Sequence, residues 1–166
     1  TVCHRIRLAP AFETYLREAH SKKARYNLRR LERIARRAHR VDVQRYEGPA
    51  VNDDVMRRVA EIQRRSWMPR RGAAMFLDAR WQELVKRIAR ASLASAWVLR
   101  LDGRDAAFVI TTFDGTCVYY EWTAFDLAFR DLSVGQLLTQ HVIEAACAEG
   151  FAALDFGQGD GAYKQF

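Results

Sequence analysis

The chain has 166 residues, of which 49% are hydrophobic and 28% charged. This is the size of about one domain, with enough apolar side chains for a real core, and no apolar run approaches the roughly 18 residues of a membrane span. The net charge of +7 is concentrated at the front, since residues 1–71 carry +11 and residues 72–166 carry −4, so a polyanionic partner is expected to meet the first half.

The first 40 residues are expected to form a helical arm, preceded by a short strand. Residues 4–8 alternate as a strand does, and Pro10 is suited to the first turn of a helix that runs to about Ala19. Ser21 is expected to cap a second helix over residues 22–40. We treat 1–40 as an N-terminal helical arm and 41–166 as the main domain.

The predicted helix at residues 22–40 is strongly basic and amphipathic. It contains nine Lys or Arg and one acidic residue, Glu32, and its apolar residues fall on one stripe. Two interpretations stay open. In the first, the helix binds tRNA or another RNA, anionic lipid, or the phosphates of a ligand. In the second, its apolar stripe faces the core and its basic side is simply solvated. Tyr26 is its one aromatic residue, which disfavours a platform for stacking single-stranded bases.

The middle of the chain predicts a strand, two helices and an antiparallel meander. Residues 41–46 alternate as a strand, and Asn52 and Asp78 are suited to cap the two helices that follow. Asp-Gly pairs at 102–103 and 114–115 separate apolar runs and predict two tight hairpins. Three consecutive antiparallel strands therefore lead to the last part of the chain.

The last part predicts a strand, a helix and a further strand. Residues 117–125 are rich in aromatic and β-branched types, residues 134–149 have helical spacing and stop at Gly150, and residues 151–156, Phe-Ala-Ala-Leu-Asp-Phe, supply a further strand. A strand, helix, strand crossover makes the two strands parallel. The expected fold is α/β with a mixed sheet.

The segment Arg130-Asp-Leu-Ser-Val-Gly135 connects that strand to the helix and predicts an anion site. The N–H groups that open a helix have no intrahelical partner and lie at the positive end of the helix dipole. Gly135 would let a phosphate approach the backbone, Ser133 could cap the helix, and Arg130 could clamp the outer oxygens. The alternative is a simple cap, a packing glycine and a solvated surface charge.

These residues resemble a known family. Arg130-x-x-Ser133-x-Gly135 is similar to the Arg/Gln-x-x-Gly-x-Gly/Ala pyrophosphate loop of GNAT acyl-CoA N-acyltransferases, with Ser in place of the first Gly. Asp155-Phe-Gly-Gln-Gly-Asp-Gly-Ala-Tyr-Lys-Gln-Phe166 and Ser21-Lys-Lys-Ala-Arg-Tyr-Asn-Leu-Arg-Arg30 resemble signatures of the cellulose-biosynthesis (CelD-type) branch. That branch is related to Fem-type transferases, which carry two such domains and use aminoacyl-tRNA.

The resemblance implies a GNAT-like fold with a splayed parallel strand pair that holds acetyl-CoA or another acyl-CoA. It also implies a role in bacterial polysaccharide biosynthesis, a companion domain before residue 1 and a closing hairpin after Phe166. Tyr163 falls where GNAT enzymes often protonate the thiolate, and Lys164 where Fem-type enzymes stabilise the oxyanion. The cofactor-binding residues implied are Thr123, Ala124 and Phe125 for the pantetheine arm and Arg130, Ser133, Val134, Gly135 and Gln136 for the pyrophosphate.

Acyl transfer to an amine needs a group that takes the amine proton and a stabiliser for the oxyanion. Glu121 is the acid on the central strand and is the expected base, unless it is an outward-facing solvated residue. Asp126 is the second choice, unless it simply starts the turn. The expected function is acyl-CoA-dependent N-acyltransfer to a small-molecule amine; the alternatives are a Fem-like aminoacyl-tRNA-dependent transferase or a non-catalytic binding module.

The cysteine and histidine residues bear on the redox environment and on metal binding. The three cysteines, at positions 3, 117 and 147, are an odd number without metal-binding spacing, which favours a reducing, cytoplasmic environment and no metal. His141 within the last helix is expected to be a packed or partly exposed residue, since no ligand-type residue stands at metal spacing from it. A homodimer is a further expectation.

Overall fold

The computed structural model describes residues 3–158; the predicted catalytic residues Tyr163 and Lys164 lie outside this range. The helices and strands, in chain order, are β1 (Cys3–Arg7), α1 (Phe12–Ala19), α2 (Lys22–Ala38), β2 (Val41–Glu47), α3 (Asp53–Arg65), α4 (Ala79–Arg90), β3 (Ala94–Leu101), β4 (Arg104–Phe113), β5 (Cys117–Phe125), α5 (Val134–Ala148) and β6 (Ala153–Gln158). Short 3₁₀ helices add η1 (Gly48–Ala50), η2 (Met68–Arg71), η3 (Met75–Leu77) and η4 (Leu127–Leu132).

One mixed sheet organises these elements, in the order β1-β6-β5-β4-β3-β2. The pairs from β2 to β5 are antiparallel, as are β1 and β6, whereas β5 and β6 are parallel. The predicted α/β fold with a meander and one parallel pair is therefore confirmed. The hairpin at Asp102-Gly103 is also confirmed, and both residues have positive φ, 50° and 81°, as a tight hairpin turn requires.

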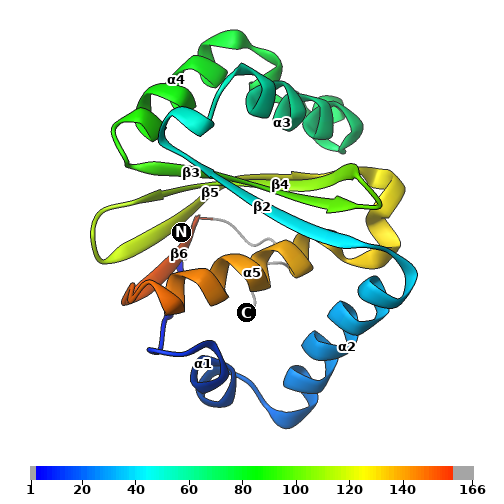
Figure 1. Cartoon of the computed structure of the whole chain (residues 1–166), viewed down its shortest axis with the longest axis vertical. Coiled ribbons are helices and arrows are strands. Elements are labelled where there is room, and N and C mark those ends of the chain that lie inside the picture. Colours follow the sequence, from blue (N-terminus) through cyan, green and yellow to red (C-terminus); the bar gives the residue numbers. More distant parts are fainter. Residues whose placement is uncertain (1–2, 159–166) are drawn as a thin grey trace.

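Helices cover both faces of the sheet (Figure 1): α3 and α4 lie over one face, and α5 lies on the other with α1 and α2 beyond it. Side chains alternate between the two layers along each strand. On β3, Trp97 and Leu99 pack into the cluster around α5, while Ala96 and Val98 pack into the cluster around α3 and α4. The α5 side therefore has one core and the α3–α4 side another.

The N-terminal segment contributes to the sheet as well as to the helical arm. β1 is an edge strand that pairs with β6, through Arg5 with Asp155 and Ile6 with Leu154. The helices α1 and α2 follow it and pack against α5. The division of the chain at residue 40 stays a prediction.

The predicted helix caps are formed at three helices. The Ser21 hydroxyl accepts a hydrogen bond from the Ala24 N–H at 3.2 Å at the start of α2, and Asn52 and Asp78 accept in the same way at α3 and α4. Each satisfies N–H groups that the helix leaves unpaired. None of the helices within residues 3–158 is long and apolar enough to cross a membrane.

Candidate active site

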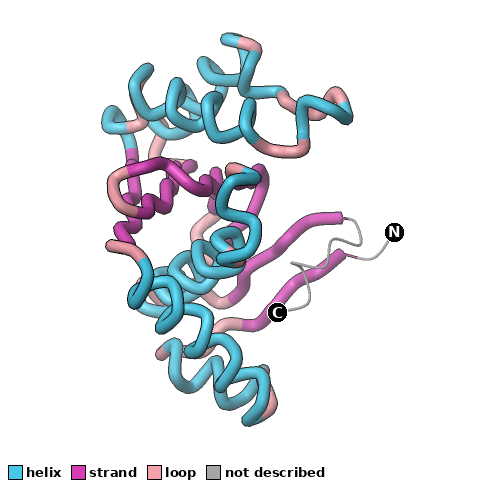
Figure 2. The backbone as a smooth tube through the Cα atoms, turned by 90° about the vertical axis from the view of Figure 1, so that its right-hand side faces the viewer, coloured by secondary structure: helices cyan, strands magenta, loops and turns pink. Residues whose placement is uncertain are grey.

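The parallel strands β5 and β6 separate part-way along their length. They pair from Cys117 with Ala153 to Tyr119 with Asp155, and the pairing stops there although β5 runs on to Phe125. Beyond that point β6 stays with β1, whose Cys3 pairs with Gln158. In Figure 2 these two strands, each ending in a grey trace, extend as a pair away from the rest of the sheet.

This separation leaves one side of β5 unpaired over residues 120–125. In a strand that pairs on one side only, every second residue directs its N–H and C=O away from the partner. Within the described residues no strand pairs with β5 on that side beyond Tyr119. An extended ligand can therefore bond to this backbone as an added strand would.

A β-bulge lies in β5 just past the point of separation. Ile110 of β4 pairs with Trp122 and Thr111 pairs with Tyr120, so Glu121 is the extra residue. The bulge reverses the alternation: Tyr120 packs into the cluster around α5, whereas Trp122 packs against the cluster around α3 and α4. A bulge changes the face of the sheet on which the following side chains lie, and this one reverses the alternation along β5 from Trp122 onward.

The bulge decides the side on which Glu121 lies. Its carboxylate accepts a hydrogen bond from the Thr112 hydroxyl at 3.1 Å, and Thr112 is two residues from Ile110, so both are on the α3–α4 face. Glu121 is exposed there, two residues beyond the last β5–β6 pair. The carboxylate is therefore accessible and lies next to the unpaired stretch of β5.

An aromatic surface borders Glu121 on the same face. The ring of Trp122 contacts Phe76 and Trp81 edge-on, with centroid distances of 5.8 and 6.2 Å. Trp81 and Leu84, one turn apart on α4, are both exposed. Exposed apolar side chains grouped beside a carboxylate are typical of a binding surface.

The junction between η4 and α5 has the backbone geometry of an anion cradle. Leu132 ends a right-handed 3₁₀ helix, Ser133 is left-handed with φ 50° and ψ 38°, and α5 begins at Val134. A left-handed residue between right-handed ones brings successive N–H groups together in a concave nest that binds anions. The family's pattern has Gly at this position, and Gly adopts this conformation without steric cost.

The predicted capping role of Ser133 is wrong. Its side chain makes no capping hydrogen bond, although the residue stands at the N-cap position of α5. Capping side chains act from an extended backbone, as at Ser21, and the left-handed backbone of Ser133 directs its hydroxyl elsewhere. The N–H groups of the first turn of α5 thus keep their capacity to bind a ligand.

The other predicted pyrophosphate residues surround this nest. Arg130 is exposed, and among the described residues its nearest acid is Asp131, also exposed, at 3.7 Å. Val134 is buried and Gln136 is half-buried, so Val134 can contribute only its backbone. A Cβ on Gly135 would lie 3.6 Å from Phe125 Cδ1, an ordinary contact, so packing alone does not require glycine there.

The predicted pantetheine residues occupy the end of β5. The Thr123 hydroxyl donates to the Phe108 carbonyl at 2.9 Å, Ala124 is buried in the α3–α4 cluster, and Phe125 packs against the cluster around α5. These side chains are engaged within the fold. Any contact that they make with a ligand must therefore come mainly from their backbone groups.

Asp126, the second choice for a base, has a structural position. It is buried, accepts from the Ala128 N–H at 2.9 Å to cap η4, and lies 3.2 Å from the Arg65 guanidinium. A buried carboxylate paired in this way fixes the start of η4 and through it the position of Arg130. Sequence reasoning missed Arg65, because only the folded chain brings α3 to the end of β5.

Comparison with known protein families identifies the family of this chain. A family model described as "Acetyltransferase (GNAT) domain" matches residues 22–165. The chain belongs to the GNAT acetyltransferase domain family. A search of curated proteins gives no match.

Solved structures share the fold of this GNAT domain. FemX aligns with a TM-score of 0.71 and 12% identity over 96% of this chain and 53% of its own. A C-terminal DUF2156 domain from Agrobacterium fabrum aligns with a TM-score of 0.63 and 17% identity over 95% and 46%. An aminoglycoside acetyltransferase from a soil metagenomic sample, in complex with sisomicin, aligns with 0.50 and 15% over 72% and 78%. The GNAT domain thus spans about half of the first two structures.

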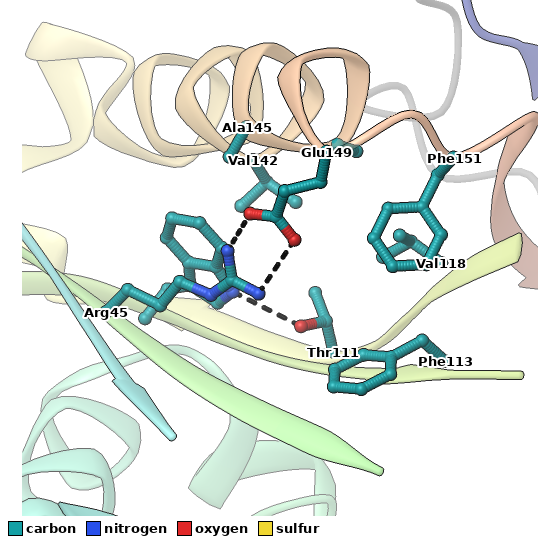
Figure 3. Close-up of a pocket in the computed structure, with 10 residues that line it drawn as sticks. Arg45, Thr111, Phe113, Val118, Val142, Ala145, Glu149 and Phe151 are labelled. Carbon is teal, nitrogen blue, oxygen red and sulfur yellow. Dashed lines mark hydrogen bonds and ion pairs between the residues drawn. The ribbon is translucent and has the colours of Figure 1, made fainter. Parts of the chain in front are cut away.

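The opposite end of α5 in this GNAT domain is closed. Figure 3 shows the Arg45 guanidinium facing the Glu149 carboxylate, to which it is hydrogen-bonded, with Phe113 and Phe151 at the side. Arg45 also lies 2.6 Å from Glu47 and 4.8 Å from the centroid of the Trp97 ring. The cavity that remains has about 10 Å³, room for about one water molecule. This region is an interlocked packing contact.

The part of the GNAT domain that the structure describes contains no group of three or more His, Cys, Asp or Glu side chains that could hold a metal ion. Cys117 and Cys147 are buried, and burial raises the pKa of both thiols. His141 is largely buried at the α2–α5 contact, and this burial lowers its pKa, in opposition to the neighbouring Glu32 and Glu144.

Proposed function

We propose that this GNAT domain transfers an acyl group from an acyl-CoA thioester to the nitrogen of an amine. The observation that carries the proposal is the unpaired stretch of β5, which begins after Tyr119 and ends at Phe125, where the Phe125 ring lies against Gly135, two residues from the anion cradle at Ser133. Together they offer a backbone edge for the extended pantetheine arm and N–H groups for the pyrophosphate. A thiol ester carried on a phosphorylated, extended arm fits both features at once.

The charge of the cofactor would be met by three contributions. The nest around Ser133 and the positive end of the α5 dipole act on the pyrophosphate through the backbone. Arg130, whose nearest acid among residues 3–158 is Asp131 at 3.7 Å, can close over the outer oxygens. Gly135 would let the phosphate come close to the backbone at the first turn.

The reaction would proceed by direct attack of the amine on the thioester carbonyl. The C–N bond forms, the carbonyl oxygen becomes negative, and an N–H group on the unpaired side of β5 stabilises that charge. The C–S bond then breaks, and the CoA thiolate takes up a proton. Tyr163 and Lys164, by resemblance, are the proposed proton donor to the thiolate and an oxyanion stabiliser.

Glu121 is the proposed acceptor of the amine proton, directly or through one water molecule. It is exposed next to the unpaired stretch of β5, and its Thr112 hydrogen bond at 3.1 Å holds the carboxylate on the α3–α4 face. The amine would therefore approach from that face. Trp81 and Trp122 border this approach, which favours an acceptor that carries an apolar or ring-shaped group beside its amine.

A thermal-shift scan followed by turnover tests this proposal. Acetyl-CoA and longer acyl-CoAs should raise the melting temperature of the protein, by an amount that grows with ligand concentration. Release of free CoA in the presence of a panel of amines should then identify the acceptor class. Absence of both ligand stabilisation and CoA release would refute the proposal, and absence of charged-tRNA binding as well would favour a non-catalytic binding module.

A second donor, aminoacyl-tRNA, is favoured by the surface of α2. Several of its basic residues form no ion pair or hydrogen bond within residues 3–158; these are Lys22, Lys23, Arg30, Arg33 and Arg37. Such a row of free cations fits a nucleic-acid backbone. Charged tRNA should then bind with a steep salt dependence that is lost when Arg30, Arg33 and Arg37 are replaced together.

We also propose a cellular process in which the domain acts. We infer from the signatures around Ser21 and Asp155 that the chain is of the CelD-type branch and acts in cytoplasmic steps of bacterial polysaccharide biosynthesis. The span of 53% of FemX supports a companion domain in the whole protein, and a homodimer is a further proposal. Accumulation of non-acylated polysaccharide precursors in a deletion strain would test the setting.

A further inference from the structure

A groove of about 390 Å³ lies between α2 and the first turn of α5. It is lined by residues of both helices and of the turn before α2: His20, Ala24, Asn27, Leu28, Arg30, Leu31 and Gln136. Its volume is within the range of small-molecule sites. Gln136 belongs to the turn of α5 that follows the anion cradle at Ser133, so the groove begins where the cradle ends.

Two sides of the groove are chemically distinct. Ala24, Leu28 and Leu31 give it an apolar floor, whereas Arg30 is exposed and forms no ion pair or hydrogen bond with any residue of the range 3–158. Its neighbour Arg29, by contrast, is paired with Glu13 at 2.6 Å. An apolar surface with one unpaired guanidinium beside it suits an aromatic ring that carries a phosphate.

The His20 side chain forms part of the wall. Its Nε2 is buried and has no partner within the described part of the chain, and its ring packs edge-on against Tyr15 with a centroid distance of 5.6 Å. Burial, together with Arg25, lowers the pKa of His20, which favours the neutral ring.

We propose that this groove binds the 3′-phosphoadenosine end of the acyl-CoA, with the adenine on the apolar floor and the 3′-phosphate on Arg30. The inference rests on the proposed function, since the pyrophosphate in the cradle at Ser133 is joined to this nucleoside. η4, which carries Arg130, also contacts α2, so the two phosphate sites are neighbours. α2 is thereby a cofactor-binding element of the domain, in addition to the loop before α5.

The test compares acetyl-CoA with 3′-dephospho-acetyl-CoA by isothermal titration calorimetry. With the unaltered protein, loss of the 3′-phosphate should weaken binding about tenfold, the effect of one good charge-assisted contact. In Arg30→Gln the two ligands should bind within about threefold of one another. Arg33→Gln, which changes the same charge on the same helix outside the groove, should keep the full difference.

Three results would overturn the inference. Equal binding of the two ligands by the unaltered protein would exclude a 3′-phosphate site. An undiminished tenfold difference in Arg30→Gln would place that site elsewhere while leaving acyl-CoA binding intact. Absence of binding by either ligand would refute the proposed function itself, and this inference with it.

Discussion

The two ends of α5 differ in almost every respect. At its C-terminal end, Arg45 is bonded to Glu149, lies over Trp97 and leaves about 10 Å³ of space. At its N-terminal end, no side chain caps the first N–H groups, Arg130 is exposed, and the neighbouring end of β5 no longer pairs with β6. The charged groups at the C-terminal end of α5 are thus partnered within the chain, whereas N–H groups and a guanidinium at its N-terminal end are available to a ligand.

This difference separates stability from function in the domain. Charges that are partnered inside the chain contribute to its free energy of folding, and a ligand can use them only by breaking those contacts. Charges and N–H groups without partners contribute little to folding and are available to a ligand. Substitutions at the two ends should accordingly affect different measurements.

Glu121→Gln should lower kcat by about 10²-fold or more, because removal of a positioned base has typically this effect. The carboxamide keeps the size of the side chain and can still accept from Thr112. Affinity for acetyl-CoA and the free energy of unfolding should be unchanged. Steady-state kinetics with calorimetry on the same samples would show this, and full activity in the variant would remove Glu121 from the mechanism.

Arg130→Ala should weaken acetyl-CoA binding about tenfold, through the loss of about 1.5 kcal/mol of charge-assisted hydrogen bonding. The free energy of unfolding should change by less than about 0.5 kcal/mol, since the side chain is exposed and its nearest acid in the described part of the chain is the exposed Asp131 at 3.7 Å. Urea unfolding and ligand titration together measure both quantities. A variant that is less stable but binds normally would reverse the assignment.

Arg45→Ala should give the opposite pattern. Loss of its contacts with Glu47, Glu149 and Trp97 is expected to lower the free energy of unfolding by about 1–2 kcal/mol, from partly exposed ion pairs and a cation–π contact. Acetyl-CoA affinity should not change. Urea denaturation beside Arg130→Ala is the matched measurement, and a loss of affinity here would mean that the two ends of α5 are coupled.

The sequence predicted the framework better than it predicted the site. Strand alternation, the Asp-Gly turns and the caps at Ser21 and Asn52 are local signals, and the structure confirms each. The bulge at Glu121 is not local, because it depends on the register of β4 against β5. For the same reason the sequence left the side of Glu121 undecided and missed the contact of Arg65 with Asp126.

The error at Ser133 has a conformational origin. A serine before a helix predicts a cap, and at Ser21 this holds because the backbone is extended. At Ser133 the backbone is left-handed, a conformation that the Gly in the family's pattern at this position adopts without steric cost. Two serines at equivalent helix positions thus have different roles.

Replacement of Ser21 and of Ser133 by alanine should have different effects on the free energy of unfolding. Ser21→Ala should lower the free energy of unfolding by about 1 kcal/mol, because the hydroxyl that accepts from the Ala24 N–H is lost. Ser133→Ala should change it by less than about 0.5 kcal/mol, since no capping bond exists to be lost. Equal losses in the two variants, measured by urea unfolding, would show that Ser133 does cap α5.

The smallest expected effect is a pH dependence at the middle of α5. Burial lowers the pKa of His141, against the opposing influence of Glu32 and Glu144, so the unfolded chain binds more protons than the folded chain just below pH 6.5. Stability should therefore fall as the pH is lowered from 7 through that interval. His141→Gln should reduce this loss, and an unchanged pH profile of unfolding would show that His141 titrates normally.

Backbone amide chemical shifts of ¹⁵N-labelled protein, titrated with acetyl-CoA, test the central claim most directly. We predict saturable perturbations at Ser133 to Gln136 and at residues 120–125, with little change around Arg45 and Glu149. Perturbations centred on the Arg45–Glu149 end of α5, or none at saturating acetyl-CoA, would contradict the account.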